Sequence, residues 1–251
     1  MGRRFEGPRA RMIMAWMVAI GAGVLAYGTA ATAYLRLPRP QPLEELAYYP
    51  SGHALRPATL GHCETAADLA WLRAVQYYGE HRRTDLRFEQ MAHVFDILTS
   101  LAPHFVPAYV FGAFALAQEG LEFREAETLM LKGMENNPTS GELAFECGFL
   151  YYVRPGGRDL RKAAEYFEQS ARQKDGPPQA ARFAAFARQH AGDLRVAYEL
   201  WNDVYQHSGN KLMREMAERE LTKIREALET GHPEIAVKKL AIPGVKLVPS
   251  N

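Results

Sequence analysis

The stretch Glu142–Asp175 constrains the fold of this chain more than any other. Two helical patterns flank the break RPGGRD, and they carry Gly148-x-x-Tyr151 and Ala163-x-x-x-Phe167 respectively. The small residues let the two helices approach closely, and the two rings fill the space between them. One such pair cannot bury its apolar face alone, so the sequence predicts neighbouring helix pairs.

Related helix pairs follow along the chain, and Pro103 and Pro138 close two of them 35 residues apart. A final charged helix has one apolar stripe, which is typical of a capping helix that covers the open end of an array. The expected helices are Ala66–Glu80 with Leu86–Leu101, Val106–Gln118 with Arg124–Asn136, the two halves of the central stretch, Gln179–Ala191 with Leu194–His207, and the capping helix Lys211–Glu229.

These features resemble the tetratricopeptide repeat, whose signature W-x-x-L-G-x-x-Y…A-x-x-x-F…P covers 34 residues. The third pair carries the best match, whereas Trp71 and Tyr78 of the first pair keep only the seven-residue spacing. The chain is similar to membrane-anchored bacterial tetratricopeptide proteins of uncharacterised function. This resemblance implies an all-α fold, in which an N-terminal transmembrane helix precedes an α-solenoid of about four helix pairs with a C-terminal capping helix.

The N-terminal 35 residues predict a membrane anchor. Residues 1–11 hold four arginines against one glutamate, and residues 12–35 form an uncharged run long enough to cross a bilayer. The positive-inside rule places Met1 in the cytoplasm and the rest of the chain outside it. For a bacterium this means a single-pass inner-membrane protein with a periplasmic domain. Ala31-x-Ala33 also fits a signal-peptidase site, so the alternative is a secreted periplasmic protein cleaved near Ala33.

The chain between the anchor and the repeats is rich in proline and glycine and predicts no regular structure. A capping box, Thr65-x-x-Asp68, is expected to start the first repeat helix, and Gly79 is expected to end it. The expected segments are a basic N-terminus (1–11), a transmembrane helix (12–35), a proline-rich linker with an irregular cap (36–65), the solenoid (66–229) and an extended C-terminal tail (230–251).

In tetratricopeptide proteins the first helix of each pair lines an inner groove, and the resemblance implies which residues do so here. The set is mainly apolar and aromatic, which suits an amphipathic helix or an extended peptide with apolar anchors. An aromatic stripe at helical spacing fits core packing equally well for any one of these residues. The implied groove residues are Leu72, Gln76, Tyr109, Ala113, Leu116, Phe145, Phe149, Tyr152, Arg182, Phe186 and Gln189. The Lys and Asn residues of the carboxylate-clamp subtype, which binds acidic chaperone tails, are missing from this set.

The sequence offers no motif for catalysis or for a cofactor. A glycine-rich phosphate loop, a Gly-x-Ser-x-Gly elbow and a His-Glu-x-x-His pair are all missing. His53, His62, Cys63 and Glu64 do not have the spacing of a zinc site. Cys147 is expected to be buried, and a disulfide with Cys63 in an oxidising compartment stays open.

The net charge of +1 argues against a surface dedicated to nucleic acid. We therefore expect a non-enzymatic, membrane-anchored scaffold or adaptor without a metal or cofactor. It would bind a protein or peptide partner in the groove, on the extracytoplasmic side. The alternative is a structural accessory subunit of a larger membrane complex, which would contact its partners through the anchor and the C-terminal tail.

Overall fold

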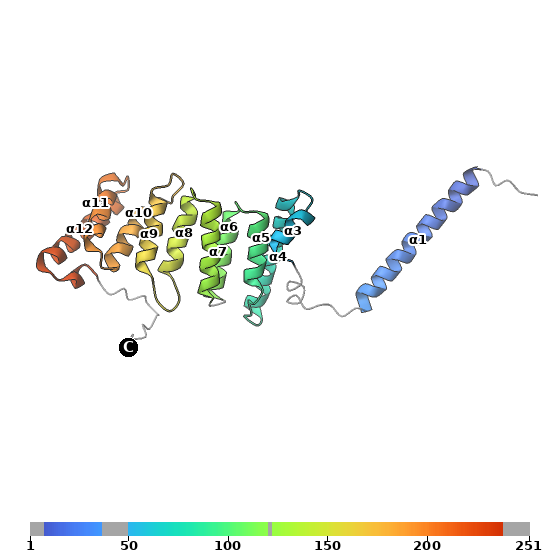
Figure 1. Cartoon of the computed structure of the whole chain (residues 1–251), viewed down its shortest axis with the longest axis horizontal. Helices are drawn as coiled ribbons and strands as arrows, with labels where there is room; N and C mark the ends of the chain where they lie inside the picture. The colour runs from blue at the N-terminus through green and yellow to red at the C-terminus, as the bar shows by residue number, and fades with distance from the viewer. Residues whose placement is uncertain (1–7, 37–49, 120–121, 238–251) are drawn as a thin grey trace, which may run out of the picture. The chain divides into compact units, whose positions relative to one another are not determined.

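The computed structural model describes residues 8–36, 50–119 and 122–237 of the chain (Figure 1). In these ranges all regular structure is helical, with eleven α-helices and one short 3-10 helix. The chain divides into two compact units, Met1–Ala47 and Tyr48–Asn251. The predicted C-terminal tail lies mostly outside the described residues.

The first unit contains the helix α1 (Pro8–Arg36). Its segment Met14–Thr32 has a mean hydropathy of 1.5 and is long and apolar enough to cross a membrane, although a signal sequence meets the same criteria. The hydroxyls of Thr29 and Thr32 donate hydrogen bonds to carbonyl oxygens one turn earlier, so α1 satisfies these polar groups internally. The prediction of one apolar N-terminal helix is confirmed.

The second unit is a succession of antiparallel helices that follow one another in sequence order (Figure 1). From α4 to α12, each helix packs against the next one along the chain. The elements are α3 (Gly52–Ala58), α4 (Cys63–Arg83), α5 (Met91–Leu101), α6 (Val106–Gln118), α7 (Phe123–Asn136), α8 (Gly141–Tyr152), α9 (Leu160–Ala171), α10 (Ala180–His190), α11 (Leu194–His207), α12 (Lys211–Thr230) and the 3-10 helix η1 (Pro233–Ile235). The all-α class and the sequentially packed helix pairs are thus confirmed.

The central pair shows why small residues are needed between α8 and α9. A Cβ atom added to Gly148 would lie 2.8 Å from the Phe167 ring and 3.0 Å from the carbonyl oxygen of Ala163. Phe167 and Ala163 are fully buried, and Tyr151 is buried as well. The predicted close approach of these two helices is therefore present in the structure.

The first repeat helix differs from its prediction at both ends. It begins at Cys63 after His62, which makes no side-chain capping bond, so the expected capping box does not start it. It also continues past Gly79 to Arg83. A Cβ atom at Gly79 would have no neighbour within 4 Å, which shows that this glycine interrupts neither the helix nor its packing.

The turn after α4 is longer than the sequence predicts, so α5 begins at Met91 and not at Leu86. Leu86 has a positive φ of 57°, which is incompatible with a continuing helix. The turn is fixed by Asp85, whose carboxylate lies 2.6 Å from Nδ1 of His81 and accepts the backbone N–H of Arg87.

The helix α3 was not predicted, because its seven residues include Pro57 and span only about two turns. Its first residue, Gly52, fits against α5 so tightly that a Cβ atom would lie 2.8 Å from the backbone of Ile97. This contact with a later helix explains why a helix forms where local sequence signals favour irregular structure.

Candidate partner-binding surface

The structure places five of the implied groove residues in the interior. Side chains with so little exposed surface mainly pack the domain, so the structure leaves these five little open surface for a partner. Tyr109, for example, directs its hydroxyl to the carbonyl oxygen of Pro103 at 3.1 Å, and burial raises the pKa of its phenol to about 12. The five are Tyr109, Ala113, Leu116, Phe145 and Gln189.

The other six implied residues keep exposed surface, but they do not form one patch. Leu72 is 59% exposed, and it lies with Gln76 on the outer face of α4. Phe149, Tyr152 and Phe186 are partly exposed and lie close together on α8 and α10. Arg182 is also partly exposed, at the start of α10. Partner binding by these residues stays a prediction.

A shift of register explains why the three predicted residues of α6 are buried. Phe114, Phe149 and Phe183 are spaced by 35 and 34 residues, and each is partly exposed. The residue in α6 that corresponds to Phe145 is therefore Val110, one position after the predicted Tyr109. Each residue turns an α-helix by about 100°, so an error of one position is enough to exchange an exposed side chain for a buried one.

Five partly exposed rings of α6, α8 and α10 form a continuous patch, which we call the aromatic surface. They are Phe114, Phe149, Tyr152, Phe183 and Phe186. The ring centroids of Phe149 lie 6.0 Å from Phe114 and 6.0 Å from Tyr152, and Tyr152 lies 6.0 Å from Phe183 and 6.3 Å from Phe186. The sequence prediction missed Phe114 and Phe183, although their spacing relative to Phe149 could have identified them.

The position of α8 is set at its N-terminal end. Ser140 caps the helix by accepting the N–H of Leu143, and Asp175 accepts the N–H of Gly141 at 2.9 Å. A Cβ atom at Gly141 would lie 2.6 Å from the backbone of Gly176, in the turn before α10. These contacts join the starts of α8 and α10 and hold their aromatic residues side by side.

Two arginines and one histidine border the aromatic surface. The guanidinium of Arg158 lies 4.9 Å from the Tyr152 ring centre, and that of Arg182 lies 5.0 Å from the Phe183 ring centre. The imidazole of His190 stacks on Phe186 at 4.0 Å. Burial lowers the pKa of His190, so its side chain is neutral at neutral pH. The positive charge beside the surface therefore comes from the two arginines.

Glu146 is the partly buried carboxyl on the same helix as Phe149. Burial raises its pKa, and repulsion from Glu142 acts in the same direction. In contrast, the pKa of Glu127 is lowered, because the hydroxyl of the buried Tyr151 donates to its carboxylate and Lys162 lies 3.3 Å away. Glu127 and Tyr151 thus join α7 to α8 on the side away from Phe149.

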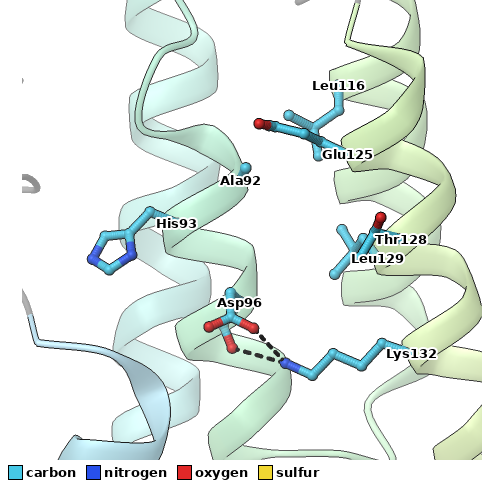
Figure 2. Close-up of a pocket in the computed structure, with 8 residues that line it drawn as sticks. All are labelled: Ala92, His93, Asp96, Leu116, Glu125, Thr128, Leu129 and Lys132. Atoms are coloured by element: carbon cyan, nitrogen blue, oxygen red, sulfur yellow. Dashed lines mark hydrogen bonds and ion pairs between the residues drawn. The ribbon is translucent and has the colours of Figure 1, made fainter.

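A separate cleft of about 340 Å³ lies between α5 and α7 (Figure 2). Leu116 and Leu129 form part of its wall, and Figure 2 shows Lys132 reaching across from α7 to Asp96 of α5. The Lys132 ammonium also contacts the hydroxyls of Thr99 and Ser100, at 3.0 and 2.9 Å. This cation holds the two helices together.

Glu125 at the other end of this cleft is a carboxyl with a raised pKa. Its hydrogen bond to Glu122, followed by burial, raises the pKa of Glu125 to about 7. Glu125 lies in the first turn of α7, at the far end of the cleft from Lys132 (Figure 2).

The remaining candidate residues for chemistry lie apart from one another. Cys63 and Cys147 are free thiols, and burial raises the pKa of Cys147 to about 12, which makes this thiol inert. His53 and His62 are exposed, on α3 and just before α4. Within the described ranges, no three His, Cys, Asp or Glu side chains come together as a metal ion would require.

Comparison of this chain with models of protein families, with curated proteins and with solved structures found no match.

Proposed function

We propose that the second unit is a tetratricopeptide-like array that binds a protein or peptide segment on its aromatic surface. The observation that carries this proposal is the continuous patch of five partly exposed rings from three different helices. Phe95, Phe167 and Trp201, which serve the interior, are buried in the same unit. Rings left in contact with water cost free energy, so a contiguous exposed patch of them favours a binding role.

The repeat interpretation is supported by two features of the helices. Phe114, Phe149 and Phe183 recur at the spacing of one tetratricopeptide repeat and occupy equivalent places on α6, α8 and α10. Gly148 allows the close packing of α8 and α9 for which the repeat signature requires a small residue. In such an array α6, α8 and α10 are first helices, which line the inner surface.

The proposed setting is the outer face of a bacterial inner membrane. The basic residues before α1 favour a cytoplasmic N-terminus, and an uncleaved α1 would confine the domain to the membrane surface. Confinement raises the effective concentration of the domain near membrane partners. The intact mass of the protein purified from membranes distinguishes this anchor from a signal sequence removed near Ala33.

Site-specific photocrosslinking in native membranes tests the binding role directly. A photoreactive amino acid replaces Phe149 or Phe186 in the full chain, and crosslinked products are identified by mass spectrometry. The controls are Leu131 on α7 and Val196 on α11, which are exposed apolar residues outside the aromatic surface. Discrete products from the two test positions and not from the controls are expected. Equal labelling at all four positions would contradict the proposal.

A second candidate function is that of an accessory subunit in a larger membrane complex. It is favoured by the outer face of α4, where Leu69 is 65%, Leu72 is 59% and Val75 is 40% exposed. Crosslinks that arise from Leu69 and not from Phe149 would favour this function. Loss of assembly on deletion of residues 238–251 would favour it too.

A further inference from the structure

We propose that the aromatic surface selects a partner segment in which carboxylates flank aromatic or aliphatic anchors, with Arg158 and Arg182 as the groups that receive the carboxylates. This inference rests on the proposed function and adds the chemistry of the partner. Two arginines lie beside the rings, and nothing in the sequence pattern indicated that either would bind a charged group.

Each arginine has its guanidinium above a ring. Arg158 lies over Tyr152 at 4.9 Å and Arg182 over Phe183 at 5.0 Å. A guanidinium near a ring face keeps N–H donors for other groups. Those donors match the two oxygens of a carboxylate in a bidentate hydrogen bond. Two cationic donors therefore lie at the border of an apolar patch.

In the described part of the chain, Arg158 and Arg182 contact rings and form no ion pair with a carboxylate. Two other cations of the same region do form such pairs. Arg188 contacts Glu168 at 2.7 Å and Asp193 at 3.3 Å, and Lys162 contacts Glu127. Glu168, Asp193 and Glu127 are thus already paired, and the charges of Arg158 and Arg182 can be met by a partner.

Arg182 carries a second sign of an absent acceptor. Its Nε atom is buried and has no hydrogen-bond partner in the protein. A buried donor without an acceptor is unfavourable, and nearly all such groups in proteins are satisfied. The guanidinium of the partly exposed Arg182 is thus under-satisfied within the protein, and a carboxylate of the bound segment would supply an acceptor to its other N–H groups.

The two arginines lie toward opposite ends of α10. Arg182 is in the first turn of α10, and Arg158 is close enough to His190, the last residue of α10, to disfavour its protonation. Eight residues separate Arg182 from His190, which corresponds to about 12 Å along the helix. A segment that lies along α10 would thus have carboxylates about four residues apart if extended, or about two turns apart if helical.

Glu146 is the acidic side chain that could oppose such a partner. Burial and Glu142 both raise its pKa, which lowers the cost of binding another carboxylate nearby. Glu146 forms no ion pair with Arg158 or Arg182 among the described contacts. The charge that the partner meets beside the rings is therefore positive.

Selection from a phage-displayed library of random dodecapeptides tests this inference. The bait is the full chain in lipid nanodiscs, and the comparison baits are the double variant Arg158→Gln with Arg182→Gln, the triple variant Phe149→Ser, Tyr152→Ser and Phe186→Ser, and the control Arg195→Gln. Arg195 is an exposed arginine on α11, outside the aromatic surface. Circular dichroism verifies that each bait is folded.

We expect the wild type and Arg195→Gln to enrich peptides with two or more carboxylates beside aromatic or aliphatic residues. The double arginine variant should lose the acidic preference and bind a synthetic selected peptide about tenfold more weakly, with a smaller effect of salt. Peptides that require the three rings but show no acidic excess would overturn this inference and leave the proposed function standing. Enrichment that survives the triple variant, or no enrichment by the wild type, would overturn both.

Discussion

At the scale of single residues, Gly148 is a position where the structure leaves little room for a larger side chain. An alanine there would bring its Cβ atom within 2.8 Å of the Phe167 ring and 3.0 Å of a backbone oxygen in α9. We expect Gly148→Ala to lower the free energy of unfolding by roughly 1–3 kcal/mol, because overpacking outweighs the gain in helix propensity. Urea unfolding of the full chain in detergent, followed by circular dichroism, measures the change.

Gly79 provides the matched control, because it lies inside a helix and a Cβ atom there would meet nothing within 4 Å. Gly79→Ala should raise the free energy of unfolding by about 0.5–1 kcal/mol through helix propensity alone. If the two variants changed stability in the same direction, close packing between α8 and α9 would not explain the requirement for glycine.

The raised pKa of Glu125 makes the stability of the second unit depend on pH. The pKa of Glu125 is raised from 4.5 to about 7 in the folded protein, so the folded state binds more protons than the unfolded state between these values. Stability from this group is therefore present at low pH and is lost as pH rises through 7. Glu125→Gln should remove this contribution to the pH dependence, because glutamine does not titrate.

The melting temperatures of wild type and Glu125→Gln, compared at about pH 5.5 and about pH 8, test this prediction. The melting temperature of the wild type should fall more than that of Glu125→Gln when the pH is raised. The control Glu64→Gln changes another exposed glutamate in the first turn of a helix. Identical pH dependence in wild type and Glu125→Gln would contradict the assignment.

At the scale of elements, a buried hydrogen-bond network joins the last helices. The amide of Gln189 on α10 accepts from Trp201 Nε1 at 2.7 Å and donates to Glu220 on α12 and to the carbonyl oxygen of Ala236, both at 2.9 Å. One side chain thus connects three helices to the residue that follows η1. Trp201 and Ala236 are buried, so water cannot replace these bonds.

We expect Gln189→Leu to lower the free energy of unfolding by about 2 kcal/mol, because it leaves a buried indole N–H and a buried carbonyl unsatisfied. Gln206→Leu, at an exposed position of α11, should change stability by less than about 0.5 kcal/mol. Urea unfolding measures both. If Gln189→Leu left the free energy of unfolding unchanged, packing and not the hydrogen-bond network would hold the end of the unit together.

Helix boundaries could be predicted where apolar periodicity and stop signals agree. α6 and α11 begin and end at the predicted residues, since Pro103 before α6 and Gly192-Asp193 before α11 mark their starts. The turn at Leu86 depends on a positive φ, and the helix α3 depends on a contact with the later helix α5. Local sequence patterns indicate neither of them.

The aromatic surface could be predicted only in part. Phe149, Tyr152 and Phe186 were identified, but Gln189 was assigned to the groove although it belongs to the interior network. The reason is geometric, because whether a side chain is exposed depends on a helix register that one residue can shift by about 100°. Arg158 lies in a loop, where no periodicity indicates which ring its side chain will cover.

At the scale of the whole second unit, packing is local in sequence. Packed pairs of helices are neighbours or next-but-one neighbours along the chain, so α4 and α12 stabilise each other only through the helices between them. The last helices have their own buried cluster, in which Trp201, Leu221 and Ile224 pack together. A substitution that destabilises one helix pair should therefore increase unfolding in only part of the unit.

Hydrogen exchange of the full chain, measured by mass spectrometry, tests how far such a weakness spreads. Gln189→Leu should accelerate exchange in α10, α11 and α12, where the network and the Trp201 cluster lie, and leave α4, α5 and α6 at wild-type rates. Gly148→Ala should accelerate exchange mainly in α8 and α9. Gln206→Leu should accelerate exchange in neither region. If Gln189→Leu accelerated exchange uniformly from α4 to α12, the unit would unfold as one cooperative block, and its helix pairs would not behave as an array.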